Sequence, residues 1–77
     1  MKKYEVTFVI VNPQDFEEFP RVKSPVYGTS EEDAIRKAQA QIMQDIDVWF
    51  DLESDPGLAG RMKEAARTAE WYAYEKV

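Results

Sequence analysis

Five carboxylates lie between residues 45 and 55, and no basic residue interrupts them. They belong to Asp45, Asp47, Asp51, Glu53 and Asp55. The alternate spacing of the last three is similar to the start of a calcium-binding loop, in which oxygens at every second position surround a hard cation. Such a loop needs a glycine where this chain has Pro56 and a closing acid where it has Met62. We therefore expect no metal at this segment.

The same acidic segment, residues 45–55, is better suited to binding a protein. A row of carboxylates imitates the phosphates of a nucleic acid and fits a basic groove on a partner. Trp49 and Phe50 lie within the row, and a large aromatic side chain often anchors an interface. We predict a protein with a basic surface as the partner, bound by Asp45, Asp47, Trp49, Asp51, Glu53 and Asp55. The alternative is a solvated helix end, with its carboxylates in water and Trp49 in the core.

Residues for nucleophilic or acid–base catalysis are scarce. The chain has no histidine and no cysteine, so Ser24, Ser30 and Ser54 lack the base that would activate a hydroxyl. Carboxylates are numerous, but a thin domain offers no obvious deep pocket in which their acidity would be altered. The sequence also has no glycine-rich loop that could cradle a phosphate. We expect neither an enzyme nor a bound cofactor.

Size and charge limit the remaining functions. Seventy-seven residues, 44% of them apolar, predict one folded domain over residues 1–77. A net charge of −5 opposes binding to a phosphate backbone, so we expect no direct contact with nucleic acid. The start Met1-Lys2-Lys3 leads into Tyr4 and Glu5 rather than into an uncharged run, which argues against export and against a membrane segment. The lack of cysteine favours the reducing cytoplasm.

The first part of the chain predicts two strands. Residues Lys3 to Val11 alternate between faces, with Tyr4, Val6, Phe8 and Ile10 on one of them. Turn residues follow at 12–15. Arg21 to Tyr27 reads as a second strand with Val22 and Val26 inward, and Pro25 restricts it to a sheet edge or a position without a ladder bond. A hairpin of these two strands is the simplest pairing.

The second part predicts two helices and a closing strand. Thr29 and Ser30 are both good helix caps, each with an acid three positions later, and apolar residues then recur at spacings of three and four up to Trp49. This helix covers about residues 30–47 and extends at most to 51. Asp55-Pro56-Gly57 signals a second helix with a weaker apolar stripe at Leu58, Met62, Ala65 and Ala66. The aromatic run from Ala69 to Val77 favours a strand.

These elements predict an α+β fold in the order β-β-α-α-β. The last strand joins the first hairpin in an antiparallel sheet of about three strands, and both helices cover one face of it. Large aromatic side chains among Trp71, Tyr72 and Tyr74 then lie on the open face. Exposed aromatics of this kind mark an interface, either with a partner or with a second copy of the chain. Self-association through the closing strand, as a homodimer, is the alternative to binding a different protein.

The run Gly28-Thr29-Ser30-Glu31-Glu32-Asp33-Ala34-Ile35, placed between a strand and an alanine-rich helix, resembles short accessory proteins of bacteriophages and prophages. Some of these are inhibitors that dock on a bacterial protein complex, and the resemblance implies action by occlusion in a bacterial or phage-infected cytoplasm. Residues 4–46 also resemble the antitoxins of the HicB type. The chain departs from that family between Pro20 and Gly28, where it lacks the Pro-Gly-Cys turn.

Overall fold

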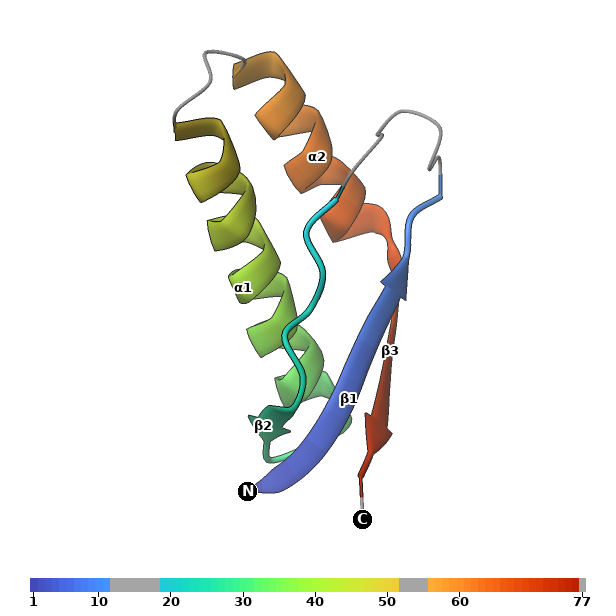
Figure 1. Ribbon diagram of the computed structural model, residues 1–77. Helices are drawn as coiled ribbons and strands as arrows, with labels where there is room; N and C mark the ends of the chain where they lie inside the picture. The colour runs from blue at the N-terminus through green and yellow to red at the C-terminus, as the bar shows by residue number, and fades with distance from the viewer. Residues whose placement is uncertain (12–18, 52–55, 77) are drawn as a thin grey trace.

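The computed structural model describes residues 1–11, 19–51 and 56–76, and they form an α+β fold. The elements follow one another as β1 (Lys2–Val9), β2 (Val26–Gly28), α1 (Glu31–Asp51), α2 (Pro56–Thr68) and β3 (Glu70–Glu75). The three strands make one antiparallel sheet in the order β2-β1-β3. Both helices lie on the same side of this sheet (Figure 1). The predicted fold class and element order are confirmed.

The sheet has one buried face and one open face. In β1 the side chains of Tyr4 and Val6 are buried against the helices, and Phe8 is half-buried on the same side. Trp71 lies opposite Phe8 in the register of β1 with β3, so the odd-numbered residues of β3 also face the helices. Tyr72 therefore points to the open face, as the aromatic pattern predicted for part of this strand.

The start of α1 is fixed by side-chain caps. The N–H of Asp33 donates to Oγ of Ser30 (3.2 Å), and the N–H of Thr29 donates to Oδ2 of Asp33 (2.9 Å). Of the two predicted caps the chain uses Ser30, and Asp33 reaches back to satisfy a second backbone donor. Gly28 lies buried just before this cap and packs closely against Ala34.

The core consists of two neighbouring clusters of buried side chains. One joins the sheet to the first half of α1 and contains Tyr4, Val6, Val26, Ala34 and Ala38. The other joins α1 to α2 and contains Ile42, Ile46, Met62 and Ala66. Val22 and Trp71 pack against both clusters, so the core is continuous along α1.

The second strand is much shorter than the sequence predicted. Arg21 to Tyr27 was expected to pair with β1, but only Val26–Gly28 does so. Pro25 has no N–H to offer a ladder. The side chain of Gln41 in α1 takes the other groups: its Nε2 donates to the carbonyl of Arg21 (3.2 Å), and its Oε1 accepts from the N–H of Lys23 (3.0 Å). This part of the chain is therefore bound to the helix instead of the sheet.

Candidate functional site: a groove beside the central strand

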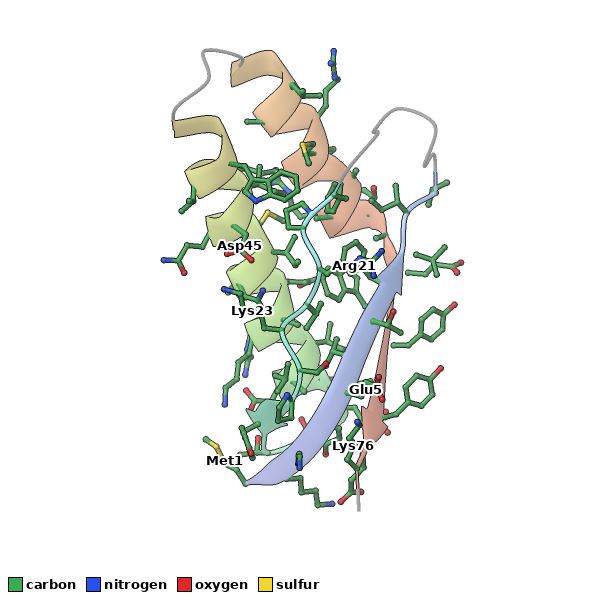
Figure 2. All side chains as sticks on the ribbon, viewed as in Figure 1. Met1, Glu5, Arg21, Lys23, Asp45 and Lys76 are labelled. Atoms are coloured by element: carbon green, nitrogen blue, oxygen red, sulfur yellow. The ribbon has the colours of Figure 1, made fainter. Side chains whose placement is uncertain are left out.

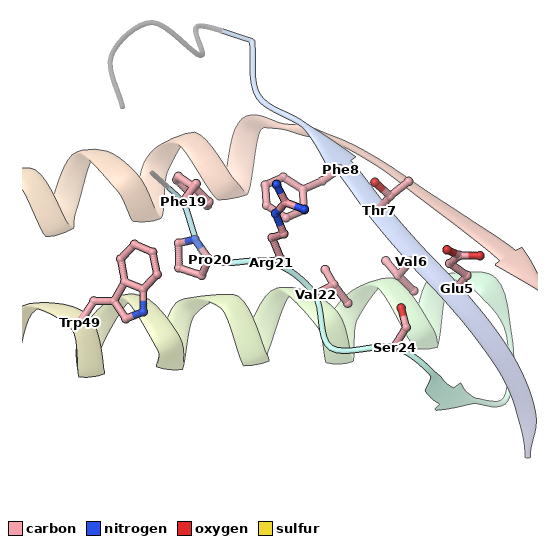
Figure 3. Close-up of a pocket in the computed structure, with 10 residues that line it drawn as sticks. All are labelled: Glu5, Val6, Thr7, Phe8, Phe19, Pro20, Arg21, Val22, Ser24 and Trp49. Carbon is pink, nitrogen blue, oxygen red and sulfur yellow. The ribbon is translucent and has the colours of Figure 1, made fainter. Parts of the chain in front are cut away.

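A groove of about 810 Å³ lies between β1 and residues 19–24, which we call the strap. Trp49 of α1 stands at the end of the groove beside Pro20, and Val6 and Ser24 lie toward the other end (Figure 3). The lining comprises Glu5, Val6, Thr7, Phe8, Phe19, Pro20, Arg21, Val22, Ser24 and Trp49. The groove exists because the strap follows the helix and leaves the adjacent edge of β1 uncovered.

The edge of β1 that faces this groove lacks a strand partner beyond Tyr4 among the residues that the structure describes. The N–H of Lys76 donates to the carbonyl of Lys3 (2.8 Å), which places the odd-numbered residues of β1 in hydrogen-bonded pairs with β3. The even-numbered residues turn their N–H and C=O to the other side. β2 pairs there only as far as Tyr4. Within the described part of the chain, the edge groups of Val6 and Phe8 consequently have no backbone partner.

Aromatic side chains form part of one wall of the groove. The ring of Phe8 stacks on Trp71 (centroids 4.6 Å apart) and meets Phe19 edge to face (5.6 Å). The indole N–H of Trp71 donates to the carbonyl of Ala66 (2.8 Å), which ties this cluster to the last turn of α2. An apolar wall of this kind offers a surface against which an apolar side chain could pack.

Arg21 is the positively charged residue on the groove lining. Its side chain is exposed, and in Figure 3 it extends from the strap toward Phe8. The guanidinium forms no ion pair with the residues that the structure describes. Glu5, the acid on the lining, lies near Lys76 (Figure 2) and pairs with it at 3.5 Å. Arg21 is thus the charge available to a ligand.

Among the acidic residues predicted to bind a partner, the structure describes the side chains of Asp45 and Asp47, and both have partners within the chain. Asp45 accepts a hydrogen bond from Nε2 of Gln41 (2.9 Å) and so orients the amide that holds the strap. Asp47 forms an ion pair with Lys63 of α2. The side chain of Asp51 and all of Glu53 and Asp55 lie outside the described residues, and their predicted role stays a prediction.

Among the predicted site residues whose side chains the structure describes, Trp49 alone lines the groove. It is 43% exposed, so the expectation that it belongs to the buried stripe of α1 is wrong. The stripe ends at Ile46, and one turn later the sheet no longer covers the helix (Figure 1). Side-chain periodicity continues past this point because it reports the helix and not the length of the sheet beside it.

Sequence reasoning missed Arg21 and Gln41. Arg21 was assigned to a strand, where its side chain would be one of several solvated charges. Gln41 lies between two apolar positions of the α1 stripe, and nothing in its local sequence indicates that its amide binds backbone twenty residues earlier. Pro25 was the available signal, since a proline just ahead of β2 already limited how far the pairing could extend.

The chain was also compared with known proteins, and no family model, curated protein or solved structure matches it. The resemblances to phage accessory proteins and to HicB-type antitoxins therefore stay predictions. Neither of the helices that the structure describes is long and apolar enough to cross a membrane. Across residues 1–11, 19–51 and 56–76, no group of three or more histidine, cysteine or acidic side chains is placed to hold a metal ion.

Proposed function

We propose that this chain is a protein-binding module that takes up an extended segment of a partner as an additional strand beside β1. The open backbone edge of Val6 and Phe8 carries this proposal. An edge with free N–H and C=O groups binds an extended peptide through main-chain hydrogen bonds, and the neighbouring pockets select its side chains. Binding of this kind occludes the segment that is taken up, which is the mode of action that the phage resemblance implies.

The lining of the groove defines the chemistry of the partner segment. Phe8, Phe19 and Trp49 provide apolar and aromatic surface, so alternate side chains of the segment are apolar where they face the core. Arg21 provides one guanidinium that forms no ion pair with the described residues, which favours a carboxylate on the segment because charge-assisted pairs with arginine are directional and strong. We therefore expect an extended, largely apolar segment that carries one acidic residue.

This proposal takes the groove, and not the acidic segment, as the contact. The carboxylates of Asp45 and Asp47 already have partners within the chain, and a basic partner would have to compete with Gln41 and Lys63 for them. Trp49 belongs to both interpretations, since it follows Asp47 in the sequence and lines the groove.

The first experiment selects peptides from a displayed library and measures their affinity by titration calorimetry. N-methylation then scans each selected peptide. A strand added to β1 hydrogen-bonds through every second residue, so methyl groups on alternate amides abolish binding and those on the intervening amides leave it unchanged. A peptide that tolerates every methyl group, or loses binding at successive amides, contradicts strand addition.

The second experiment reverses the charge in the groove. Arg21→Glu is expected to weaken binding of an acidic peptide by about tenfold to a hundredfold, since a hydrogen bond to a charged group contributes about 1.5–3 kcal/mol. Arg61→Glu is the matched control, because Arg61 is exposed on α2 and does not line the groove. Equal effects of the two variants would show that Arg21 does not contact the peptide.

A further inference from the structure

The sheet has a second open edge, on the outer side of β3. The opposite edge is formed by β2, which has three residues and follows directly after Pro25, so it offers little to a neighbouring strand. β3 has six residues, Glu70–Glu75, and no proline. In the described residues no strand pairs with its outer side. An exposed edge of this length presents unpaired N–H and C=O groups on which the strand of another chain can pair.

The register with β1 determines which groups of β3 face outward. The even-numbered residues of β3 lie opposite the odd-numbered residues of β1, with which they exchange hydrogen bonds. Trp71, Ala73 and Glu75 consequently turn their N–H and C=O groups away from β1. Their side chains lie on the helix side of the sheet, whereas Tyr72 and Tyr74 are exposed on the open face.

We propose that two copies of the chain pair antiparallel through β3, about a two-fold axis at Ala73. Facing residues in an antiparallel pair share one side of the sheet. Ala73 then lies opposite its own equivalent, Tyr72 lies opposite the partner's Tyr74, and Glu70 lies opposite the partner's Lys76. Because the axis repeats every contact, the interface contains two pairs of opposite charge and two aromatic pairs. Within one copy Lys76 pairs with Glu5 (3.5 Å) and Glu70 accepts a hydrogen bond from the hydroxyl of Tyr72 (2.9 Å). All four side chains are exposed, so the charge pairs across the axis add to these contacts.

The charged residues favour the axis at Ala73 over an axis one residue earlier or later along β3. An axis at Tyr72 places Glu70 opposite the partner's Tyr74, and an axis at Tyr74 places Tyr72 opposite the partner's Lys76. Both alternatives shorten the overlap and lose the two ion pairs. The axis at Ala73 uses the whole strand and joins the two three-stranded sheets into one continuous sheet. It also covers part of Tyr72 and Tyr74, which are 41% and 59% exposed in one copy.

Sedimentation equilibrium of the full chain tests the pairing. We expect a reversible dimer. Glu70→Lys and Lys76→Glu each place like charges opposite one another twice, and each is expected to raise the dimer dissociation constant on the order of tenfold. The double variant Glu70→Lys/Lys76→Glu restores the attraction and the dimer. Glu32→Lys changes the net charge as Glu70→Lys does, but Glu32 is exposed at the start of α1, so the dissociation constant should stay unchanged.

Cysteine pairing tests the register, and the chain has no cysteine of its own to interfere. Tyr72 and the partner's Tyr74 form a pair without hydrogen bonds, with Cα atoms about 4.5 Å apart, which is a distance that a disulfide can span. A mixture of Tyr72→Cys and Tyr74→Cys chains should oxidise to a mixed disulfide much faster than either variant forms a disulfide with itself. A chain that is monomeric across the micromolar range, or a dimer that shows neither charge restoration nor the mixed disulfide, overturns the proposal.

Discussion

Among the acids in the described part of the chain, Asp33 has the most strongly shifted pKa. The pKa is lowered even though 13% of the side chain is exposed and burial alone would raise it. The backbone N–H of Thr29 is the main cause, followed by the hydrogen bond from Arg36, and together they hold the pKa of this carboxyl well below its ordinary value. Arg36 and Lys37 lie 2.7 and 3.3 Å from its oxygens. The ionised form is therefore bound more tightly in the folded chain than in the unfolded chain.

This depressed pKa gives the stability of the fold a pH dependence. The contribution of Asp33 is fully present above the ordinary pKa of an aspartate, about 4, and is lost as the pH falls below it toward the folded pKa. Asp33→Asn should lower the free energy of unfolding near neutral pH and flatten its decline between about pH 5 and about pH 2. Urea unfolding across this range measures both effects. Parallel declines in the two proteins would show that Asp33 does not contribute to the acid sensitivity.

Gly28 and Gly60 should respond oppositely to replacement by alanine. A Cβ on Gly28 would lie 2.9 Å from the backbone nitrogen of Ala34 and 3.0 Å from Oδ2 of Asp33. Because the α1 backbone cannot move away without losing its cap, Gly28→Ala should reduce the free energy of unfolding by about 1–3 kcal/mol. Gly60 lies within α2 with nothing near a Cβ, so Gly60→Ala should increase it by about 0.5–1 kcal/mol. Thermal unfolding of both variants provides the comparison, and a change of the same sign would refute it.

The strap depends on one side chain of α1. Gln41 bonds to the backbone of Arg21 and of Lys23 and is oriented by Asp45. Gln41→Leu keeps the approximate size but leaves those backbone groups without a protein partner, so the free energy of unfolding should fall by about 1–3 kcal/mol. Hydrogen exchange of the Lys23 amide should also become faster. Gln44→Leu, at an exposed position of the same helix, is the control. An unchanged Lys23 amide in Gln41→Leu would mean that the strap is held by its other contacts.

The elements of this fold could largely be predicted from the sequence, but the groove could not. The cap at Ser30, the stripe through Ile42 and the alternation around Val6 are local signals, and each is confirmed. The length of β2 was wrong because it depends on competition between β1 and the distant Gln41 for the same backbone groups. The groove results from that competition, and so does the open edge at Val6 and Phe8. Long-range hydrogen bonds of this kind leave no periodic pattern in a sequence.

The two core clusters determine how the molecule unfolds. The cluster between the sheet and α1 and the cluster between the two helices have no buried residue in common, yet Val22 and Trp71 pack against both. A chain of this length is expected to have a free energy of unfolding of about 4–12 kcal/mol. Neither cluster is large enough to stay folded without the other, since each relies on α1 and on the same bridging side chains. We therefore expect both to unfold in one cooperative step.

Single truncations in each cluster test this cooperativity. Ile46→Ala should cost about 2–5 kcal/mol and Val6→Ala about 1–3 kcal/mol. In either variant the slowest-exchanging amides of β1 and of α2 should lose protection by the same free energy, because both elements open together.

Trp49→Phe provides a background in which Trp71 is the remaining tryptophan, so the fluorescence of Trp71 should change at the same urea concentration as the circular dichroism of the helices. Two results would contradict this expectation: different urea midpoints for fluorescence and circular dichroism, or an Ile46→Ala variant in which the α2 amides lose protection while the β1 amides keep it. Either result would show that the molecule contains two folding units, because Trp71 would then fail to couple the helix pair to the sheet.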